Sequence, residues 1–270
     1  MRTKKMARPG RSRSYSPDRP QYRPATREDF YIYGLNPVSE ALKSGARITA
    51  IFVHRQSAGS LKAVMGLAES KLIPVKLVEK DFFDAKFDKG HQGIAASVAP
   101  KELLDIEDLI DRAFRKSSTP FFVVLDCIED PRNFGAILRV ADAAGADGVV
   151  FQSRRSAGLT PVVYKASAGA IQHVAMAEVV NIKHAVALMK ERDVTIVGAE
   201  ADAPSGIWEV DLKGPIAVVV GSEGEGMRRT VKEMCDVLVS LPMRGIVNSL
   251  NVSVATGIIA YEVMRQRRKI

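Results

Sequence analysis

Near its C-terminus the sequence places several amide and hydroxyl side chains directly before a long apolar run. Asn248, Ser249 and Asn251 follow a loop-forming segment at 242–245, and the apolar run begins at Val252. Either Ser249 or Asn251 suits a helix N-cap, because its side-chain oxygen can accept a hydrogen bond from a free backbone N–H. Capping and loop bonding explain any one of these residues. The cluster as a whole favours a function beyond packing.

The apolar run itself predicts a helix over 249–268. Its large apolar side chains cover most of a helical circumference, which indicates a buried helix rather than a surface one. These side chains are Val252, Val254, Ala255, Ile258, Ile259 and Val263. Cations at the end of the run, including Arg265 and Arg267, suit a helix C-terminus.

A second polar group lies between a predicted strand at 121–125 and a predicted helix at 133–144. A helix that starts after a strand presents free N–H groups, which favour an anion. Asn133 and Arg139 are six residues apart, so they project from different sides of this helix. Arg139 stands among apolar residues. It fits a structural pair with a carboxylate as well as it fits a ligand.

A glycine-rich loop, GSEGEG at 221–226, follows another predicted strand at 216–220. Its glycines allow the backbone to approach a ligand closely. The spacing matches neither the dinucleotide nor the triphosphate fingerprint, and Glu223 and Glu225 would repel phosphate. A ligand of the adenosine type with a positive centre fits this loop better, although a plain tight turn is common for any one such loop.

The remaining reactive side chains indicate neither a metal site nor a disulfide. Cys127 and Cys235 are far apart and form no CxxC pair, and the four histidines lack ligand spacing. The sequence therefore predicts no metal and a reducing compartment, the cytoplasm. No apolar stretch is long enough to cross a bilayer, so we expect no membrane partner.

The elements that position these groups form an α/β domain over 119–270. Strands are predicted at 121–125, 148–151, 174–179, 195–197, 216–220 and 237–241, and helices at 133–144, 182–191, 227–234 and 249–268. Strands that alternate with helices predict a mostly parallel sheet whose ligand crevice lies at the carboxyl ends of the strands. All three polar segments follow such strands.

A smaller α/β unit precedes it over 28–100. Strands are predicted at 31–33, 48–53, 73–78 and 93–98, with helices at 61–70 and from 36 to 41, where Pro37 would take the first helical position. It carries no catalytic constellation, so recognition is its expected task. The segment 101–118 reads as a helix followed by a polar linker and marks the domain boundary.

Residues 1–27 are rich in Arg, Ser and Pro and predict a disordered basic tail. Residues 1–29 hold nine basic and three acidic side chains, so most of the net charge of +8 lies there. The tail could contact nucleic-acid phosphates or act only as a solubilising segment.

The three polar segments together resemble the signature motifs of the SpoU (TrmH-like) RNA ribose 2′-O-methyltransferases of the SPOUT superfamily. Asn133, Gly135 and Arg139 match N-x-G-x-x-x-R, 221–227 reads GSEGEGM, and 242–253 matches P-M-x-G-x-V-x-S-L-N-V-S. The unit at 28–100 resembles the family's L30e-like RNA-binding domain. Within the family, the chain resembles the bacterial enzymes that methylate a guanosine ribose in large-subunit ribosomal RNA.

This resemblance implies a C-terminal domain whose last segment is threaded into a trefoil knot. It implies a homodimer, with the active site completed at the subunit interface. The implied cofactor is S-adenosylmethionine, with Gly221 as a main-chain contact and with Leu241 and Leu250 beside the adenine.

The resemblance also implies roles in transfer of a methyl group to a ribose 2′-hydroxyl. Because an arginine is too basic to serve as a general base, Arg139 would orient phosphate and hydroxyl and stabilise developing negative charge. Asn133 would orient the substrate or Arg139, and Glu223 would hold Arg139 or the ligand loop. Ser249 and Asn251 would position ribose or cofactor.

The sequence is also compatible with two other functions. The protein could be a non-catalytic RNA-binding or ribosome-assembly factor on the same fold, which the intact motifs disfavour. It could also methylate transfer RNA, because a shared fold is weak evidence for a particular RNA target.

Overall fold

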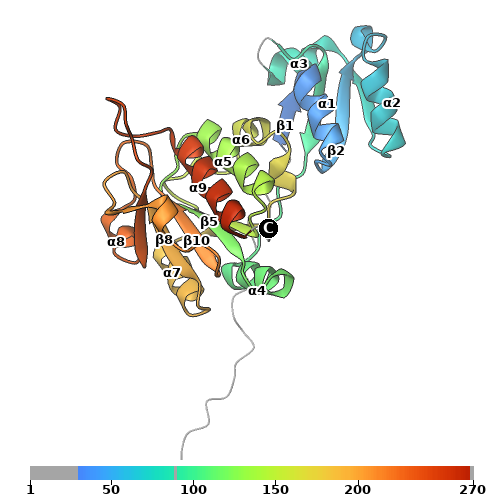
Figure 1. Ribbon diagram of the computed structural model, residues 1–270. Coiled ribbons are helices and arrows are strands. Elements are labelled where there is room, and N and C mark those ends of the chain that lie inside the picture. The colour runs from blue at the N-terminus through green and yellow to red at the C-terminus, as the bar shows by residue number, and fades with distance from the viewer. Residues whose placement is uncertain (1–29, 88–89, 268–270) are drawn as a thin grey trace, which may run out of the picture.

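The computed structural model describes residues 30–87 and 90–267. The predicted basic tail at 1–27 lies outside this range. Within it the chain forms two α/β parts, each built on its own sheet, and Figure 1 shows them as two lobes. The larger part follows residue 104 and carries all three polar segments.

The larger sheet is parallel throughout its described strands, as the sequence predicts. Its order is β7-β6-β5-β10-β8-β11-β9. The strands are β5 (Phe121–Leu125), β6 (Gly148–Gln152), β7 (Met176–Val179), β8 (Thr195–Ala199), β9 (Ser205–Gly206), β10 (Ile216–Val220) and β11 (Val237–Ser240). The direction of strand addition reverses between β5 and β10. Such a reversal opens a crevice at the carboxyl ends of the two strands.

Helices cover both faces of this sheet, and successive strand residues face opposite layers. The helices are α4 (Ile106–Lys116), α5 (Pro131–Ala143), α6 (Pro161–Ala166), α7 (Ile182–Lys190), α8 (Arg229–Lys232) and α9 (Val252–Arg267). Val123 and Val218 pack under α5 and α9, whereas Val124 and Val219 pack under α4 and α7. This burial on both faces explains why the central strands are continuously apolar.

The smaller part contains a mixed sheet of order β1-β4-β2-β3. Its elements are β1 (Phe30–Tyr33), α1 (Leu35–Lys43), β2 (Ile48–His54), α2 (Lys62–Ser70), β3 (Val75–Val78), α3 (Lys80–Lys86) and β4 (Ile94–Val98). The prediction for Pro37 was wrong by two positions, because α1 begins at Leu35. Helix α3, which we did not predict, packs Phe82 in a stacked ring contact against Phe52 of β2.

The segment 101–118 contains the predicted helix, α4, which packs on the large sheet. Leu109 and Ile110 of α4 are buried against the large sheet, and Leu104 forms a parallel β-bridge with Ala177 of β7. Phe30 of the small part contacts Tyr164 of α6, with ring centroids 4.2 Å apart. The two parts therefore meet at β1 and α6 through side-chain packing.

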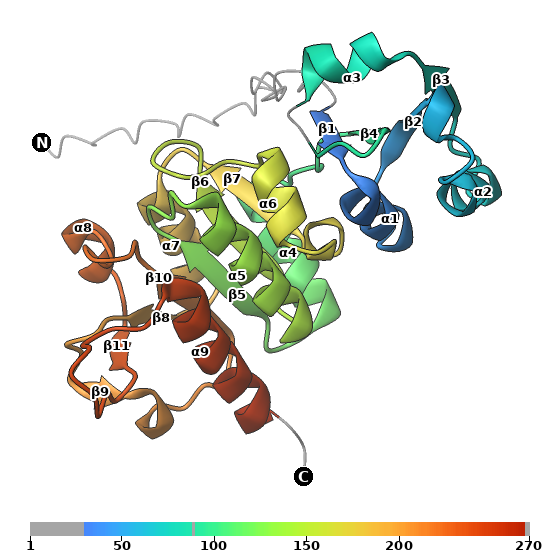
Figure 2. The ribbon, with the colours of Figure 1, turned by 90° about the horizontal axis from the view of Figure 1, so that it is seen from above.

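Helix α9 differs from its prediction in two respects. It begins at Val252, not at 249. Of the two predicted N-cap residues, Asn251 is the N-cap, since its Oδ1 accepts from the backbone N–H of Ser253 at 3.0 Å. It is also not buried all round: Val254 is 50% exposed and Ile258 38%. One face packs on α5 and the sheet, as Figure 2 shows, while the apolar opposite face is open.

Candidate functional site

The glycine-rich loop after β10 folds back on itself. Ser222 and Gly226 exchange backbone hydrogen bonds in both directions, each of 3.0 Å. This closure brings the Gly226–Met227 peptide directly over Gly221, where a Cβ would lie 2.1 Å from the carbonyl carbon of Gly226. No side chain fits at position 221, so glycine is required there for the loop to close.

Glu200, at the end of β8, anchors the far side of this loop. Its Oε1 accepts from the backbone N–H of Met227 at 3.0 Å, and its Oε2 accepts from Lys232 Nζ at 3.2 Å. The glycines thus provide an open backbone, and a neighbouring strand holds that backbone in place. Sequence reasoning missed Glu200, because the contact joins residues 27 positions apart.

Three of the predicted site residues form one hydrogen-bonded group, here called the polar triad. Asn133 Nδ2 donates to Glu223 Oε1 at 2.9 Å, and Asn251 Nδ2 donates to Asn133 Oδ1 at 2.9 Å and to Glu223 Oε1 at 2.5 Å. The backbone N–H of Val252 also approaches Glu223 Oε1 at 3.4 Å. The triad therefore joins the starts of α5 and α9 to the glycine-rich loop. Glu223 is bonded to the two asparagines rather than to Arg139.

A first cavity, of about 670 Å³, lies beside the triad at the carboxyl ends of β8, β10 and β11. Gly221, Leu241, Ser249 and Leu250 line it, together with Asn251. The structure thus gathers the residues that we assigned to a cofactor around a space large enough for a nucleoside-sized ligand. Ser249 reaches this space from the loop before α9, not from the helix itself.

Arg139 is separated from this group. It is exposed on α5 and lines neither this cavity nor a neighbouring one at the carboxyl ends of β5 and β10. Within its own chain, Arg139 and the triad do not form one cluster. The structure places Arg139 on the helix that packs against α9.

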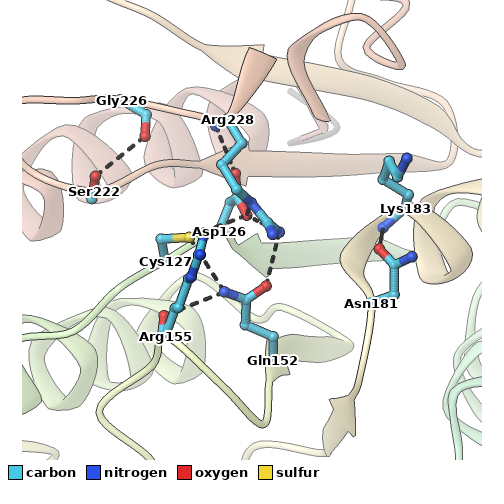
Figure 3. Close-up of polar contacts among 9 residues, drawn as sticks. All are labelled: Asp126, Cys127, Gln152, Arg155, Asn181, Lys183, Ser222, Gly226 and Arg228. Atoms are coloured by element: carbon cyan, nitrogen blue, oxygen red, sulfur yellow. Dashed lines mark hydrogen bonds and ion pairs between the residues drawn. The ribbon is translucent and has the colours of Figure 1, made fainter. Parts of the chain in front are cut away.

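A second cavity, of about 720 Å³, lies where the strand order reverses between β5 and β10. Its wall contains Arg228, which donates from Nε to Asp126 Oδ1 at 2.8 Å and from Nη2 to Gln152 Oε1 at 2.8 Å (Figure 3). Asp126 is fully buried, and its hydrogen bond raises the pKa of the Arg228 guanidinium. We did not predict this network, although a carboxylate directly after an apolar strand is a signal for it.

Residues 30–87 and 90–267 contain no group of three or more His, Cys, Asp or Glu side chains arranged to hold a metal ion. Among the helices of the same residues, none combines the length and apolarity of a membrane span.

Comparison with protein-family models matches both parts of the chain. Residues 120–261 match the SpoU rRNA Methylase family, and residues 31–104 match a domain described as RNA 2'-O ribose methyltransferase substrate binding. The first match covers more than half of the chain and includes the polar triad.

Curated relatives resemble the chain over almost their full length. A protein of Bacillus subtilis named as a TrmH family tRNA/rRNA methyltransferase is 43% identical over 89% of this chain and 97% of its own. A 23S rRNA (guanosine-2'-O-)-methyltransferase of Pseudomonas putida is 39% identical over 88% of this chain and 96% of its own.

Solved structures share the fold. An RNA 2'-O ribose methyltransferase superimposes with a TM-score of 0.70 at 27% identity, covering 89% of this chain and 90% of its own. An AdoMet-bound rRNA methyltransferase of Sinorhizobium meliloti superimposes with a TM-score of 0.71 at 22% identity, covering 90% of this chain and 89% of its own. The family matches, the relatives and the triad at the motif positions agree: this chain belongs to the SpoU rRNA methylase family of RNA methyltransferases.

Proposed function

We propose that this protein transfers a methyl group from S-adenosylmethionine to the ribose 2′-hydroxyl of a guanosine in large-subunit ribosomal RNA, in the cytoplasm. The observation that carries the proposal is the polar triad, Asn133, Glu223 and Asn251, on the wall between two adjacent cavities. Family membership supports RNA methylation. The identity to the Pseudomonas putida relative supports the guanosine and the ribosomal target.

The first cavity fits S-adenosylmethionine in its chemistry. The glycine backbone at 221 allows close approach, Leu241 and Leu250 offer apolar surface to a planar base, and Glu225 adds negative charge. When bound, S-adenosylmethionine supplies an electrophilic methyl group on a positively charged sulfur. The acceptor oxygen therefore needs to be aimed at that methyl group and to lose its proton.

The triad suits the task of aiming the acceptor. Its three side chains hold one another, so little conformational freedom remains to be lost when a ribose hydroxyl binds. In this proposal Asn133 orients the ribose, Glu223 fixes both asparagines, and Asn251 together with Ser249 positions the cofactor side. Arg139 orients the neighbouring phosphate and stabilises negative charge on the oxygen.

We infer that Arg139 performs this role in the partner subunit of a homodimer. Arg139 is exposed on α5 and stands apart from the triad of its own chain. The adjacent helix α9 leaves Ile258 and Tyr261 exposed, at 38% and 48%, and an apolar face of this kind is typical of a subunit interface. A two-fold dimer through this face would bring α5 of each chain toward its partner.

We also propose that the last segment of the chain is threaded into a trefoil knot and that the small part, residues 28–100, recognises the RNA. The segment that follows β11 lines the first cavity together with the glycine-rich loop and then enters α9, which packs on α5. A chain that returns to the middle of the sheet in this way is compatible with threading. The match of residues 31–104 to a substrate-binding domain supports RNA recognition.

The experiment that tests the function is transfer of labelled methyl groups from S-adenosylmethionine to unmodified ribosomal and transfer RNA, with the modified ribose mapped. Label at one guanosine 2′-oxygen of large-subunit RNA is the expected result. Label in transfer RNA alone would keep the reaction and replace the substrate. No label and no cofactor binding would leave a non-catalytic RNA-binding factor on this fold.

A further inference from the structure

We propose that the second cavity receives the base of the target nucleotide, turned out of the RNA, and that Arg155 and Arg228 recognise it. This inference rests on the proposed methyl transfer and adds the site of the acceptor base. The cavity lies at the carboxyl ends of β5 and β10, where the strand order reverses, which is the usual position of a ligand in an open α/β sheet.

The two cavities meet at the polar triad. Asn133 lines the second cavity and Asn251 lines the first, and the two side chains are joined by a hydrogen bond of 2.9 Å. Glu223 lines both. A nucleotide whose base occupies the second cavity would therefore present its ribose at the triad, directly across from the cofactor.

Arg228 is held rigidly at the second cavity. Its backbone N–H and its Nε both donate to the buried carboxylate of Asp126, each at 2.8 Å, and its Nη2 donates to Gln152. The Arg228 side chain nevertheless remains 35% exposed. A guanidinium fixed by a buried acid and still open to the cavity is a preorganised donor for a ligand.

The same network maintains backbone strain on the wall of this cavity. Cys127 and Arg155 both have positive φ, of 60° and 54°, which is uncommon for residues other than glycine. Gln152, only 3% exposed, donates from Nε2 to Cys127 Sγ and to the carbonyl of Arg155, each at 3.3 Å (Figure 3). One buried amide thus fixes two strained residues on the cavity wall, and strain of this kind concentrates at ligand sites.

The charges on the wall select the ligand class. The arginines of the wall, Arg155, Arg228 and Arg229, offer hydrogen-bond donors, and its carboxylates, Glu129, Asp130, Glu223 and Glu225, offer acceptors. A phosphate alone would be attracted by the arginines and repelled by the carboxylates. Guanine has acceptors at O6 and N7 and donors at N1 and N2, so it can bond to both kinds of side chain, whereas adenine carries a donor where guanine has O6.

Neighbouring arginines allow a matched test. Arg154 and Arg155 are both exposed on the same loop, but Arg155 alone of the two lines the cavity. Arg155→Gln and Arg154→Gln each remove one positive charge and shorten the side chain by the same amount. We expect Arg155→Gln to raise the KM for RNA by about tenfold or more, and Arg154→Gln to change it by less than about threefold. The Kd for S-adenosylmethionine should stay the same in both variants.

A second measurement reports the base directly. Guanosine 5′-monophosphate should inhibit methyl transfer competitively with RNA, about tenfold more strongly than adenosine 5′-monophosphate, and Arg155→Gln should remove that preference. Equal rises in KM for the two variants, or equal inhibition by the two nucleotides, would overturn the assignment of this cavity. A wild-type protein that methylates no RNA would instead overturn the proposed function itself.

Discussion

At the scale of single residues, Glu223 joins the glycine-rich loop to the starts of two helices. Its Oε1 accepts from Asn133, Asn251 and the backbone of Val252. The Glu223→Gln substitution removes the negative charge of this side chain and some of the hydrogen bonds that it accepts. We expect methyl transfer to fall by about 10- to 100-fold in kcat/KM, because a hydrogen bond to a charged group contributes about 1.5–3 kcal/mol.

The matched control is Glu107→Gln, which removes an exposed carboxylate from the first turn of α4, far along the chain from the triad. Both variants should be compared with the wild type by steady-state kinetics and by thermal unfolding. Unchanged kcat/KM in a folded Glu223→Gln protein would contradict the role given to the triad.

Cys235 provides a prediction for pH dependence. Burial, with the nearby charge of Asp236, raises the pKa of its thiol to about 11. The folded state therefore favours the protonated thiol. This contribution to stability is complete below the unfolded pKa of about 8.5 and is lost as the pH rises toward the folded value.

Urea unfolding should therefore show a midpoint that falls between pH 8.5 and about 11 more steeply in the wild type than in Cys235→Ala. Native protein at pH 8 should also resist alkylation by iodoacetamide at Cys235, and it should react in urea. Rapid alkylation of the folded protein at that position would contradict the raised pKa.

The residues of the triad could be predicted from the sequence, and the network around Arg228 could not. Asn133, Glu223 and Asn251 stand in recognisable motifs at the carboxyl ends of apolar strands. Asp126 and Arg228 are 102 positions apart. The position of Asp126 directly after an apolar strand is a signal for a site, but nothing along the chain identifies Arg228 as its partner. Their partnership follows from the adjacency of β5 and β10, which the order of elements along the chain does not reveal.

At the scale of elements, the glycine-rich loop depends on the absence of a side chain at Gly221. In Gly221→Ala the new Cβ would lie 2.1 to 2.3 Å from backbone atoms of Gly226 and Met227. Because both neighbours are backbone, the loop has to open. We expect Gly221→Ala to lower the affinity for S-adenosylmethionine by about 100-fold or more, measured by calorimetry.

Gly214→Ala is the control for this change. A Cβ at that position meets nothing within 4 Å, and its φ is not in the left-handed range. This variant should bind the cofactor as the wild type does, with a melting temperature within a few degrees of it. Cofactor binding that survives in Gly221→Ala would show that the loop is not part of the cofactor site.

The sequence predicted the strands of the large sheet well and the surroundings of α9 poorly. Continuous apolar runs such as 216–220 identify strands covered on both faces. The even distribution of apolar residues around α9 indicates that the helix is buried. It does not show whether the helix is buried by its own chain or by a second chain. Helix α3 was missed because Lys80–Lys86 is short and four of its residues are charged.

At the scale of the whole molecule, Arg267 fastens the end of α9 to two distant segments. It donates from Nη1 to the carbonyl of Thr119 at 2.8 Å, and from Nε and Nη2 to the carbonyls of Leu212 and Gly214 at 3.1 and 2.6 Å. Arg267→Ala leaves these carbonyls without their donor. We expect it to lower the free energy of unfolding by about 2–4 kcal/mol.

Chemical denaturation would measure this change in the free energy of unfolding. Intact cofactor binding would show that the variant keeps its native fold. Lys80→Ala, which breaks an exposed pair with Asp84, serves as control and should cost less than about 0.5 kcal/mol. If Arg267→Ala lowered the free energy of unfolding by no more than Lys80→Ala does, then packing of α9 on α5, and not the hydrogen bonds of Arg267, would hold the C-terminal helix in place.

The separation of Arg139 from the triad gives the proposed dimer a direct test. If Arg139 acts on the partner's substrate, Arg139→Ala inactivates the active site of the partner subunit. Glu223→Gln inactivates the active site of the subunit that carries it. A heterodimer of the two variants then contains one site with an intact triad and an intact Arg139. Purified through two different tags, it should recover about half of the wild-type activity per dimer, although each homodimer is nearly inactive. If Arg139 acts within its own chain, both sites of the heterodimer are defective and activity stays at the level of the single variants. Ile258→Glu places a charge on the exposed face of α9, so it should yield monomers in sedimentation and abolish the recovery.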